Sequence, residues 1–302
     1  AVVTDAGEQM PVHEDARNTI AFIKKSHRQG KPFFINLWIH EPHTPFHTVP
    51  KYRWRFRDLD EADNIYASVL SHADDRIGQV LDTLDRLQLS DDTLVIFSSD
   101  NGPARASQNT EIALMHDTAT GAGFGIGAAK GITGGRKGYK ASLYEGGVGV
   151  PFIARWPGRI PAGQVDRTSP LSAVDLLPTF CEIAGADLPR EYTPDGLSQL
   201  AALTGEPHTL RRKPLFWKMQ GRAKSDTHWV AFAIADQRWK LVTNQDASRL
   251  ELYDLVADPL EQVDLQEQHP EVRDSLLKKL DTWKASLPES PDPSCFSKER
   301  KK

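Results

Sequence analysis

The chain has 302 residues, of which 39% are hydrophobic and 26% charged, and its formal net charge is -4. This is the composition of an ordinary globular protein, and at roughly 150 residues per domain the length allows one large domain and a smaller one. Charges of both signs without a basic stripe argue against nucleic-acid binding, and no stretch approaches the ~20 apolar residues of a membrane span. Cys181 and Cys295 form no CxxC pair and no zinc-binding spacing, so they leave the cellular compartment open.

The N-terminal part of the chain predicts helices that alternate with strands. A helix is expected after Pro11, and the apolar run at residues 33–39 predicts a buried strand. This strand ends in the proline-containing loop 40–45, because two prolines are incompatible with a helix or a central strand. Helical periodicity over residues 60–87 and a second buried strand over 93–97 complete the βαβ unit of a parallel sheet.

The remaining residues divide into a glycine-rich loop, a third strand and a C-terminal antiparallel region. Residues 104–139 have little periodicity and many glycines, which predicts a long loop. A strand over 150–156 and an apolar helix over 174–184 follow. Three short strands then predict an antiparallel meander, at residues 215–219, 228–234 and 238–242. A last helix begins at Pro270.

We therefore predict an α/β fold with a mostly parallel or mixed sheet flanked by helices, and a smaller C-terminal antiparallel sheet-plus-helix subdomain. The expected boundaries are residues 1–205 for the α/β domain, 206–288 for the subdomain and 289–302 for a loose tail.

Polar clusters follow two of the expected strands, at the edge of an α/β sheet where ligands gather. Asp100 and Asn101 offer a carboxylate and an amide oxygen, which suit Ca²⁺ or Mg²⁺. Two adjacent ligands do not hold a divalent ion unaided, and a plain Asn-Gly turn is the alternative interpretation. His43 is a candidate general acid, anion donor or metal ligand, or a loop histidine that caps a turn, and His40 is a weaker candidate.

The glycine-rich segment 134–140 carries Arg136, Lys137 and Lys140, and such a flexible basic backbone can approach a phosphate or sulfate closely. Glu145 follows, and a buried carboxylate there can orient a lysine or hold backbone amides. The alternative is a surface loop of solvated lysines. The chain has no G-x-S-x-G motif and neither cysteine lies in a polar, glycine-rich turn, so the residues predict an anion- and metal-binding half-site without a nucleophile.

These motifs stand in the order of one family. The sequence resembles the formylglycine-dependent sulfatases of the alkaline phosphatase superfamily over nearly its whole length, in segments 33–45, 72–78, 97–103, 134–147, 150–158, 175–179 and 251–259. The resemblance implies that Asp100 and Asn101 are two of the calcium ligands. It implies that His43 hydrogen-bonds the sulfate ester and assists the leaving oxygen, and that Lys140 contacts the sulfate.

Three further residues, His40, Lys137 and Glu145, are candidates for substrate binding. The substrate implied by the resemblance is a sulfated small molecule or carbohydrate. Family members are often exported, so the same analogy suggests a periplasmic or secreted protein.

The chain also departs from the family pattern. Family members begin with a strand that ends in paired aspartates and then carry a Cys-x-Pro/Ala-x-Arg motif, whose cysteine becomes formylglycine. Cys181 stands in Cys-Glu-Ile-Ala-Gly and Cys295 in Cys-Phe-Ser-Lys-Glu, and neither fits. We therefore expect the later portion of a sulfuric ester hydrolase, with an incomplete calcium site and no activity alone.

Two alternative interpretations stay open. One is a phosphodiesterase or phosphonate hydrolase of the same superfamily, although such enzymes usually have His where this chain has Asn101. The other is a non-catalytic remnant that binds carbohydrate or acts as a scaffold.

Overall fold

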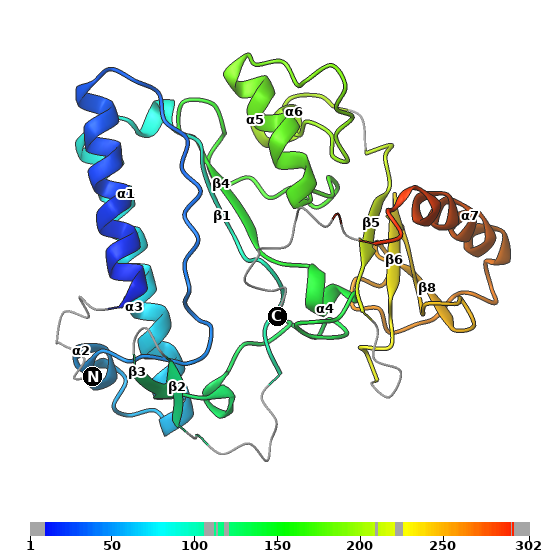
Figure 1. Cartoon of the computed structure of the whole chain (residues 1–302), viewed down its shortest axis with the longest axis horizontal. Helices are drawn as coiled ribbons and strands as arrows, with labels where there is room; N and C mark the ends of the chain where they lie inside the picture. Colours follow the sequence, from blue (N-terminus) through cyan, green and yellow to red (C-terminus); the bar gives the residue numbers. More distant parts are fainter. Residues whose placement is uncertain are drawn as a thin grey trace. The chain divides into compact units, whose positions relative to one another are not determined.

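The computed structural model describes residues 10–105, 112, 114–117, 121–208, 211–220, 226–290 and 292. The chain divides into two compact units (Figure 1). The first consists of Ala1–Thr133, Val150–Val165 and Leu203–Glu206, and the second of Gly134–Gly149, Asp166–Ala202 and Pro207–Lys302. The domain boundaries expected at residues 205 and 288 stay predictions.

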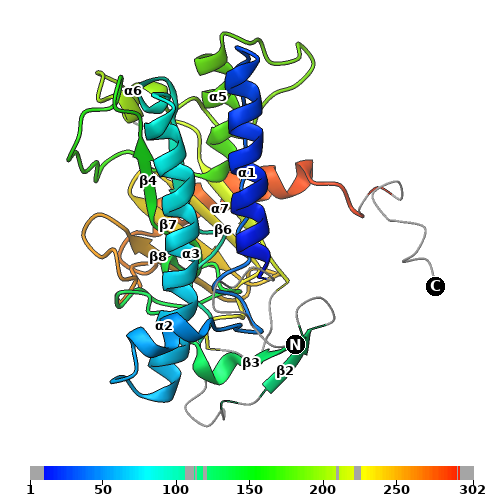
Figure 2. The same ribbon diagram turned by 90° about the vertical axis from the view of Figure 1, so that its left-hand side faces the viewer.

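Two long helices dominate the first unit. Helices α1 (Pro11–Arg28) and α3 (Glu61–Arg86) stand side by side, and the short helix α2 (Pro50–Arg55) packs on α3 (Figure 2). Both long helices lie where the sequence predicts them. Helix α3 begins where it does because the side chain of Asp60 accepts a hydrogen bond from the backbone N–H of Asp63 at 2.8 Å. The unit has two cores, formed by Met10, Val12, Val49, Tyr52 and Ala73, and by Phe46, Ile65, Val69, Ala128 and Ala129.

The described strands of the first unit form two antiparallel pairs. Strand β1 (Val95–Ser98) pairs with β4 (Phe152–Arg155), which confirms two of the expected strands. Strand β2 (Leu114–Asp117) pairs with β3 (Gly121–Phe124) inside the stretch expected to be a loop, so that expectation is wrong there. Sequence patterning missed β3 because its Gly-Ala-Gly-Phe sequence has no apolar alternation.

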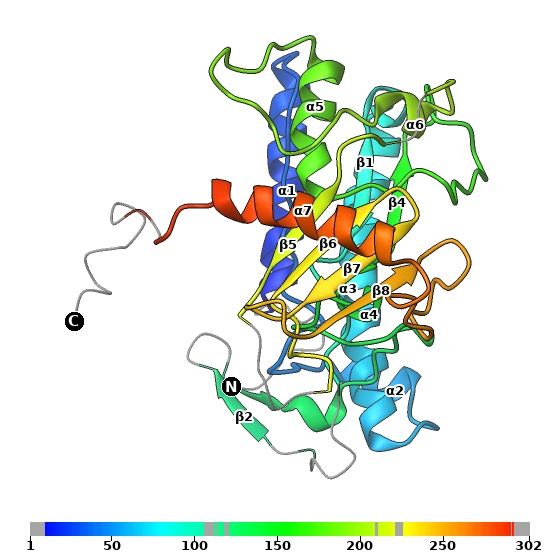
Figure 3. The same cartoon turned by 90° about the vertical axis from the view of Figure 1, so that its right-hand side faces the viewer.

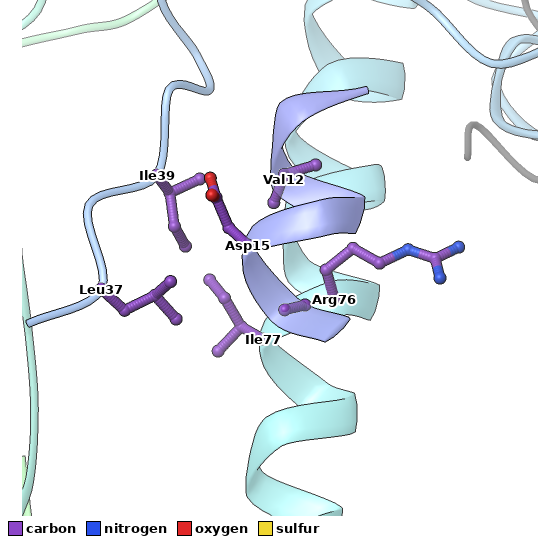
Figure 4. Close-up of a pocket in the computed structure, with 7 residues that line it drawn as sticks. Val12, Asp15, Leu37, Ile39, Arg76 and Ile77 are labelled. Atoms are coloured by element: carbon purple, nitrogen blue, oxygen red, sulfur yellow. The ribbon is translucent and has the colours of Figure 1, made fainter. Parts of the chain in front are cut away.

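The segment 33–39 is extended but is not a strand of any sheet among the described residues. Leu37 and Ile39 point toward Val12 and Ile77 of the two long helices (Figure 4), whereas the Trp38 side chain is 81% exposed. The expectation of a strand buried on both faces is therefore wrong. An apolar run predicts extended backbone, but a strand also needs a neighbour to pair its backbone groups, and the run itself carries no information on that neighbour.

The second unit contains a four-stranded antiparallel sheet with the order β5-β6-β7-β8. The strands are Leu215–Lys218, Phe232–Asp236, Trp239–Thr243 and Leu250–Asp254. Helix α7 (Pro270–Ser286) packs across one face of this sheet through Leu276 and Leu280 (Figure 3). The unit also holds helices α4 (Glu145–Val148) and α5 (Leu176–Ala184), and α6 (Leu200–Thr204) lies across the division between the units. The α/β class and the C-terminal antiparallel sheet with its helix are confirmed. Every strand pair among the described residues is antiparallel, so the parallel pairing of the expected βαβ unit is not found there.

Among the described residues, no helix has both the length and the apolar character needed to cross a membrane.

Candidate functional site

The proline-rich loop after residue 39 brings two imidazoles together. The ring centroids of His40 and His43 lie 5.6 Å apart, and the backbone N–H of His43 donates to the carbonyl of His40 at 2.9 Å. Nδ1 of His43 lies 2.7 Å from the carbonyl oxygen of Thr44. A carbonyl only accepts hydrogen bonds, so Nδ1 carries the proton and Nε2 is the atom available to a ligand. His43 is exposed, which is the arrangement that an acid or anion donor needs.

Glu41, between these two histidines, is a titratable group that the sequence did not single out. Its Oε2 is buried and has no hydrogen-bond partner among the described residues. Burial raises the pKa of Glu41 to about 7, and the nearby charge of Asp15 adds to the increase. A carboxyl group with a pKa near neutrality can exchange protons at physiological pH, and its position between two histidines was the signal available in the sequence.

The raised pKa of Glu41 predicts a specific dependence of stability on pH. Below its unfolded-state pKa of 4.5 the carboxyl is protonated in both states, and its full stabilising contribution is present. As pH rises from 4.5 through about 7, the unfolded state ionises first and that contribution is lost. Urea unfolding should show that the free energy of unfolding falls between pH 5 and pH 8. The fall should be about 1–3 kcal/mol larger in the wild type than in Glu41→Gln.

The control is Glu191→Gln, because Glu191 is an exposed residue. This control variant should keep the wild-type change in unfolding free energy. Equal changes for wild type and Glu41→Gln would show that Glu41 is not the titrating group.

The Asp100-Asn101 turn follows β1 directly and presents oxygen donors. The backbone N–H of Asn101 donates to Oδ1 of Asp100 at 2.9 Å. Nδ2 of Asn101 donates to the carbonyl of Gly102 at 3.0 Å, which fixes the amide so that its Oδ1 faces away from this bond as an acceptor. The second carboxylate oxygen of Asp100 and Oδ1 of Asn101 are hard donors of the kind that Ca²⁺ takes. No group of three His, Cys, Asp or Glu side chains suited to a metal occurs in the described part of the chain.

In the second unit, segment 134–149 folds back on itself so closely that two of its positions admit only glycine. A Cβ at Gly146 would lie 2.2 Å from the carbonyl oxygen of Gly138, and one at Gly147 would lie 2.2 Å from that of Ser142. The backbone N–H of Gly146 also donates to the carbonyl of Lys137 at 2.7 Å. The segment therefore has a defined shape, and the interpretation as a loop of solvated lysines does not describe it.

Lys137 lies in a network with the C-terminal sheet. Its ammonium donates to Oε2 of Glu251 at 2.9 Å and to the hydroxyl of Tyr253 at 2.7 Å, and it lies 4.4 Å from the ring centroid of Tyr144. Burial opposes ionisation of Glu251, but hydrogen bonds from Tyr144, Tyr253 and Lys137 outweigh it and lower the pKa of Glu251. The cation of Lys137 is thus balanced inside the unit.

Glu145 contacts a second, more deeply buried lysine. Nζ of Lys240, which is 0% exposed, lies 2.7 Å from Oε1 of Glu145 and 2.9 Å from Oε1 of Glu261. The backbone N–H of Glu145 donates to Oε2 of Glu261 at 2.6 Å. Glu145 therefore orients a lysine and begins helix α4, and the lysine that it orients comes from β7.

Lys140 differs from both residues. Its carbonyl lies 3.1 Å from Nε2 of His228, but its ammonium makes no hydrogen bond or ion pair with any described residue. Of the predicted site residues, His40, His43, Asp100 and Asn101 thus belong to the first unit, and Lys137, Lys140 and Glu145 to the second.

Comparison with known proteins gives two family matches. Residues 10–186 match the model of the sulfatase family, and residues 136–286 match that of the N-sulphoglucosamine sulphohydrolase C-terminal region. The chain is 28% identical over 273 residues to an N-acetylgalactosamine-6-O-sulfatase of Bacteroides thetaiotaomicron, a match that covers 86% of the chain and 48% of that protein. It is 36% identical over 153 residues to human steryl-sulfatase, with 50% of the chain and 24% of that protein covered.

Solved structures agree with these matches. The structure of Ps i-CgsB in complex with k-i-k-neocarrahexaose is similar with a TM-score of 0.72 and 25% identity, covering 90% of the chain and 54% of that protein. The chain spans about half the length or less of the curated relatives named here. Because the sulfatase model matches more than half of its residues, in the order of the site segments described above, the chain belongs to the sulfatase family.

Proposed function

We propose that this chain supplies part of the active site of a sulfuric ester hydrolase that acts on a sulfated carbohydrate. The observation that carries this proposal is the pair of oxygen donors at the end of β1, Asp100 and Asn101, in a chain of the sulfatase family. The relative named as an N-acetylgalactosamine-6-O-sulfatase supports a sugar sulfate as the substrate class.

Asp100 and Asn101 would hold a calcium ion together with ligands from outside these 302 residues. Their donor set fits calcium, because the atoms that can coordinate are the carboxylate oxygens of Asp100 and Oδ1 of Asn101, all of them hard oxygen donors. When bound, the ion would balance the negative charge of the sulfate group. Two ligands are too few for Ca²⁺, which takes six to eight oxygens, so the half-site needs further donors.

Two side chains are proposed to contact the substrate directly. Lys140 would bind a sulfate oxygen, since its ammonium has no partner among the described residues. His43, when protonated on both ring nitrogens, would donate from Nε2 to the ester oxygen and supply this proton as the sulfur–oxygen bond breaks. His40 is proposed to assist in binding. Lys137 and Glu145, proposed earlier as substrate ligands, would hold segment 134–149 in place through Glu251 and Lys240.

The nucleophile is the component that these residues lack. Neither Cys181 nor Cys295 stands in the Cys-x-Pro/Ala-x-Arg motif. We therefore propose that the 302-residue chain alone does not hydrolyse sulfate esters, and that activity needs the segment carrying the nucleophile.

The test is a chimera in which this chain replaces the matching region of the Bacteroides thetaiotaomicron N-acetylgalactosamine-6-O-sulfatase. The chimera should release sulfate from N-acetylgalactosamine 6-sulfate in the presence of calcium. His43→Ala and Lys140→Ala should each lower kcat by about 100-fold or more. The isolated chain, assayed in parallel, should show no turnover above background.

Three outcomes would contradict the proposal. Turnover by the isolated chain at the rate of a complete sulfatase would show that it carries its own nucleophile. A folded chimera whose activity is unaffected by both substitutions would exclude the assigned residues. Phosphodiester hydrolysis stimulated by zinc or manganese would favour the phosphodiesterase alternative.

A further inference from the structure

Helix α2 and the turn after it carry cationic and aromatic residues that the proposed hydrolysis does not use. Residues 51–57 alternate the two kinds, as Lys51, Tyr52, Arg53, Trp54, Arg55, Phe56 and Arg57. An open hollow of about 560 Å³ lies beside this helix, lined by Arg53, Trp54, Arg57, Leu59, Glu61 and Asn64. This α2 hollow is wide open to solvent, so a ligand bound there would be covered by the protein on one side only.

Trp54 offers an accessible aromatic surface in the α2 hollow. Its side chain is 68% exposed even though the guanidinium of Arg57 lies 4.4 Å from its ring centroid. Nη1 of Arg57 donates to the carbonyl of Trp54 at 3.3 Å, which keeps the cation beside the ring. An exposed indole with a stacked guanidinium can bind the apolar C–H face of a sugar ring and an attached anion together.

Two polar atoms of residues lining the α2 hollow lack partners. Nη1 of Arg53 and Oδ1 of Asn64 are buried and make no hydrogen bond with any residue that the structure describes. Nδ2 of Asn64 donates to the backbone carbonyl of Arg53 at 2.8 Å, which ties the Asn64 side chain to the backbone of helix α2. Nη1 of Arg53 is a cationic donor, and Oδ1 of Asn64 is a neutral acceptor. Because both atoms are shielded from solvent, a ligand reaches them only if the side chains around them move, so binding is assigned to the exposed groups of the α2 hollow.

The charges around the α2 hollow favour an anion. Arg53 and Arg57 face one carboxylate among the lining residues, that of Glu61. The neighbouring Asp60 is already engaged, because it caps helix α3 and lies 3.8 Å from Nζ of Lys130. Two guanidinium groups against one carboxylate give the α2 hollow a net positive charge.

We propose that the α2 hollow binds a sulfated sugar unit of an oligosaccharide. The sugar ring stacks on Trp54, and its sulfate binds the guanidinium groups of Arg53 and Arg57. The choice of a sulfated carbohydrate rests on the proposed function. The binding residues themselves are separate from His43, Lys140 and the Asp100-Asn101 turn, so the α2 hollow can be tested without hydrolysis.

The experiment measures binding of a fluorescently labelled chondroitin 6-sulfate hexasaccharide to the 302-residue chain by anisotropy. Trp54→Ala should weaken binding about tenfold or more, and Trp54→Phe should retain most of it. Arg53→Gln/Arg57→Gln should weaken binding by at least about tenfold and reduce its dependence on salt. The chemically desulfated hexasaccharide should bind the wild type as weakly as the sulfated one binds this double variant.

Matched controls lie elsewhere in the chain. Trp38→Ala removes another exposed tryptophan, and Arg167→Gln/Arg190→Gln removes two exposed arginines. Both should bind like the wild type, and circular dichroism should show every variant folded. His43→Ala/Lys140→Ala should keep the part of the binding that depends on Trp54, so that adding Trp54→Ala weakens it further.

Unchanged affinity in both Trp54→Ala and the Arg53/Arg57 variant would overturn the proposal. So would equal affinity for the desulfated hexasaccharide. Binding lost only in His43→Ala/Lys140→Ala would overturn it while supporting the proposed function. If the chimera has no sulfatase activity but the chain still loses binding in Trp54→Ala, the proposed function is contradicted and the α2 hollow is supported.

Discussion

Lys240→Met should lower the free energy of unfolding by about 3–5 kcal/mol. The ammonium of Lys240 is completely buried and lies within 3 Å of carboxylate oxygens of Glu145 and Glu261. Without it, Glu261, whose side chain is 0% exposed, loses its cation. Burial already raises the pKa of Glu261 in the folded chain, which shows how unfavourable its charge is there. Urea unfolding followed by circular dichroism measures the loss.

Two further variants separate the buried charge from general effects of the substitution. Lys218→Met changes an exposed lysine of the same sheet and should shift stability by less than about 0.5 kcal/mol. Lys240→Met/Glu261→Gln should regain part of the loss, because glutamine is neutral and its oxygen can still accept from the Glu145 backbone. A stable Lys240→Met variant would show that the three charges are not coupled.

Arg211→Met should have an effect of similar size, about 3–5 kcal/mol, through a different buried pair. Nη1 of Arg211 lies 2.6 and 2.7 Å from the two carboxylate oxygens of Asp175, which is 0% exposed. Asp175 also accepts from the backbone N–H groups of Ser172 and Leu197, both at 2.8 Å. The substitution leaves this carboxylate buried with backbone donors but no cation.

The control is the adjacent Arg212→Met, because Arg212 is exposed. Urea unfolding should place Arg212→Met within about 0.5 kcal/mol of the wild type. If Arg211→Met and Arg212→Met change the free energy of unfolding equally, the buried Arg211–Asp175 pair contributes no more to stability than an exposed arginine does.

Local patterns in the sequence predicted the elements that depend on local forces. Helix α3 has apolar residues at helical spacing and an aspartate at its N-cap, and it begins within one residue of the expected position. The meander and α7 were visible for the same reason. The strand expected at residues 33–39 was wrong because strand pairing is not local: the apolar run favours extended backbone but carries no information on a partner, and none of the described residues pairs with it.

The candidate site shows the same division. The oxygen donors of Asp100 and Asn101 could be predicted because both follow one strand directly. The three basic residues of segment 134–140 could not be told apart by composition. The partners of Lys137 are Glu251 and Tyr253, more than a hundred residues away, so only the fold shows that its charge is already balanced. Glu41 was missed because its raised pKa comes from burial, which the loop sequence does not reveal.

The extended segment 33–39 has a consequence for how another chain segment can join this protein. Its side chains alternate between the long helices and solvent, with Leu37 and Ile39 on one side and Trp38 on the other. Side chains along a strand repeat every two residues, so a shift of one residue would turn Trp38 toward the helices and Leu37 outward. The packing of Leu37 and Ile39 thus fixes in advance which backbone N–H and C=O groups face a strand added at this edge. A shift of one residue within segment 33–39 would therefore expose Leu37 and Ile39, the residues that hold the segment against α1 and α3.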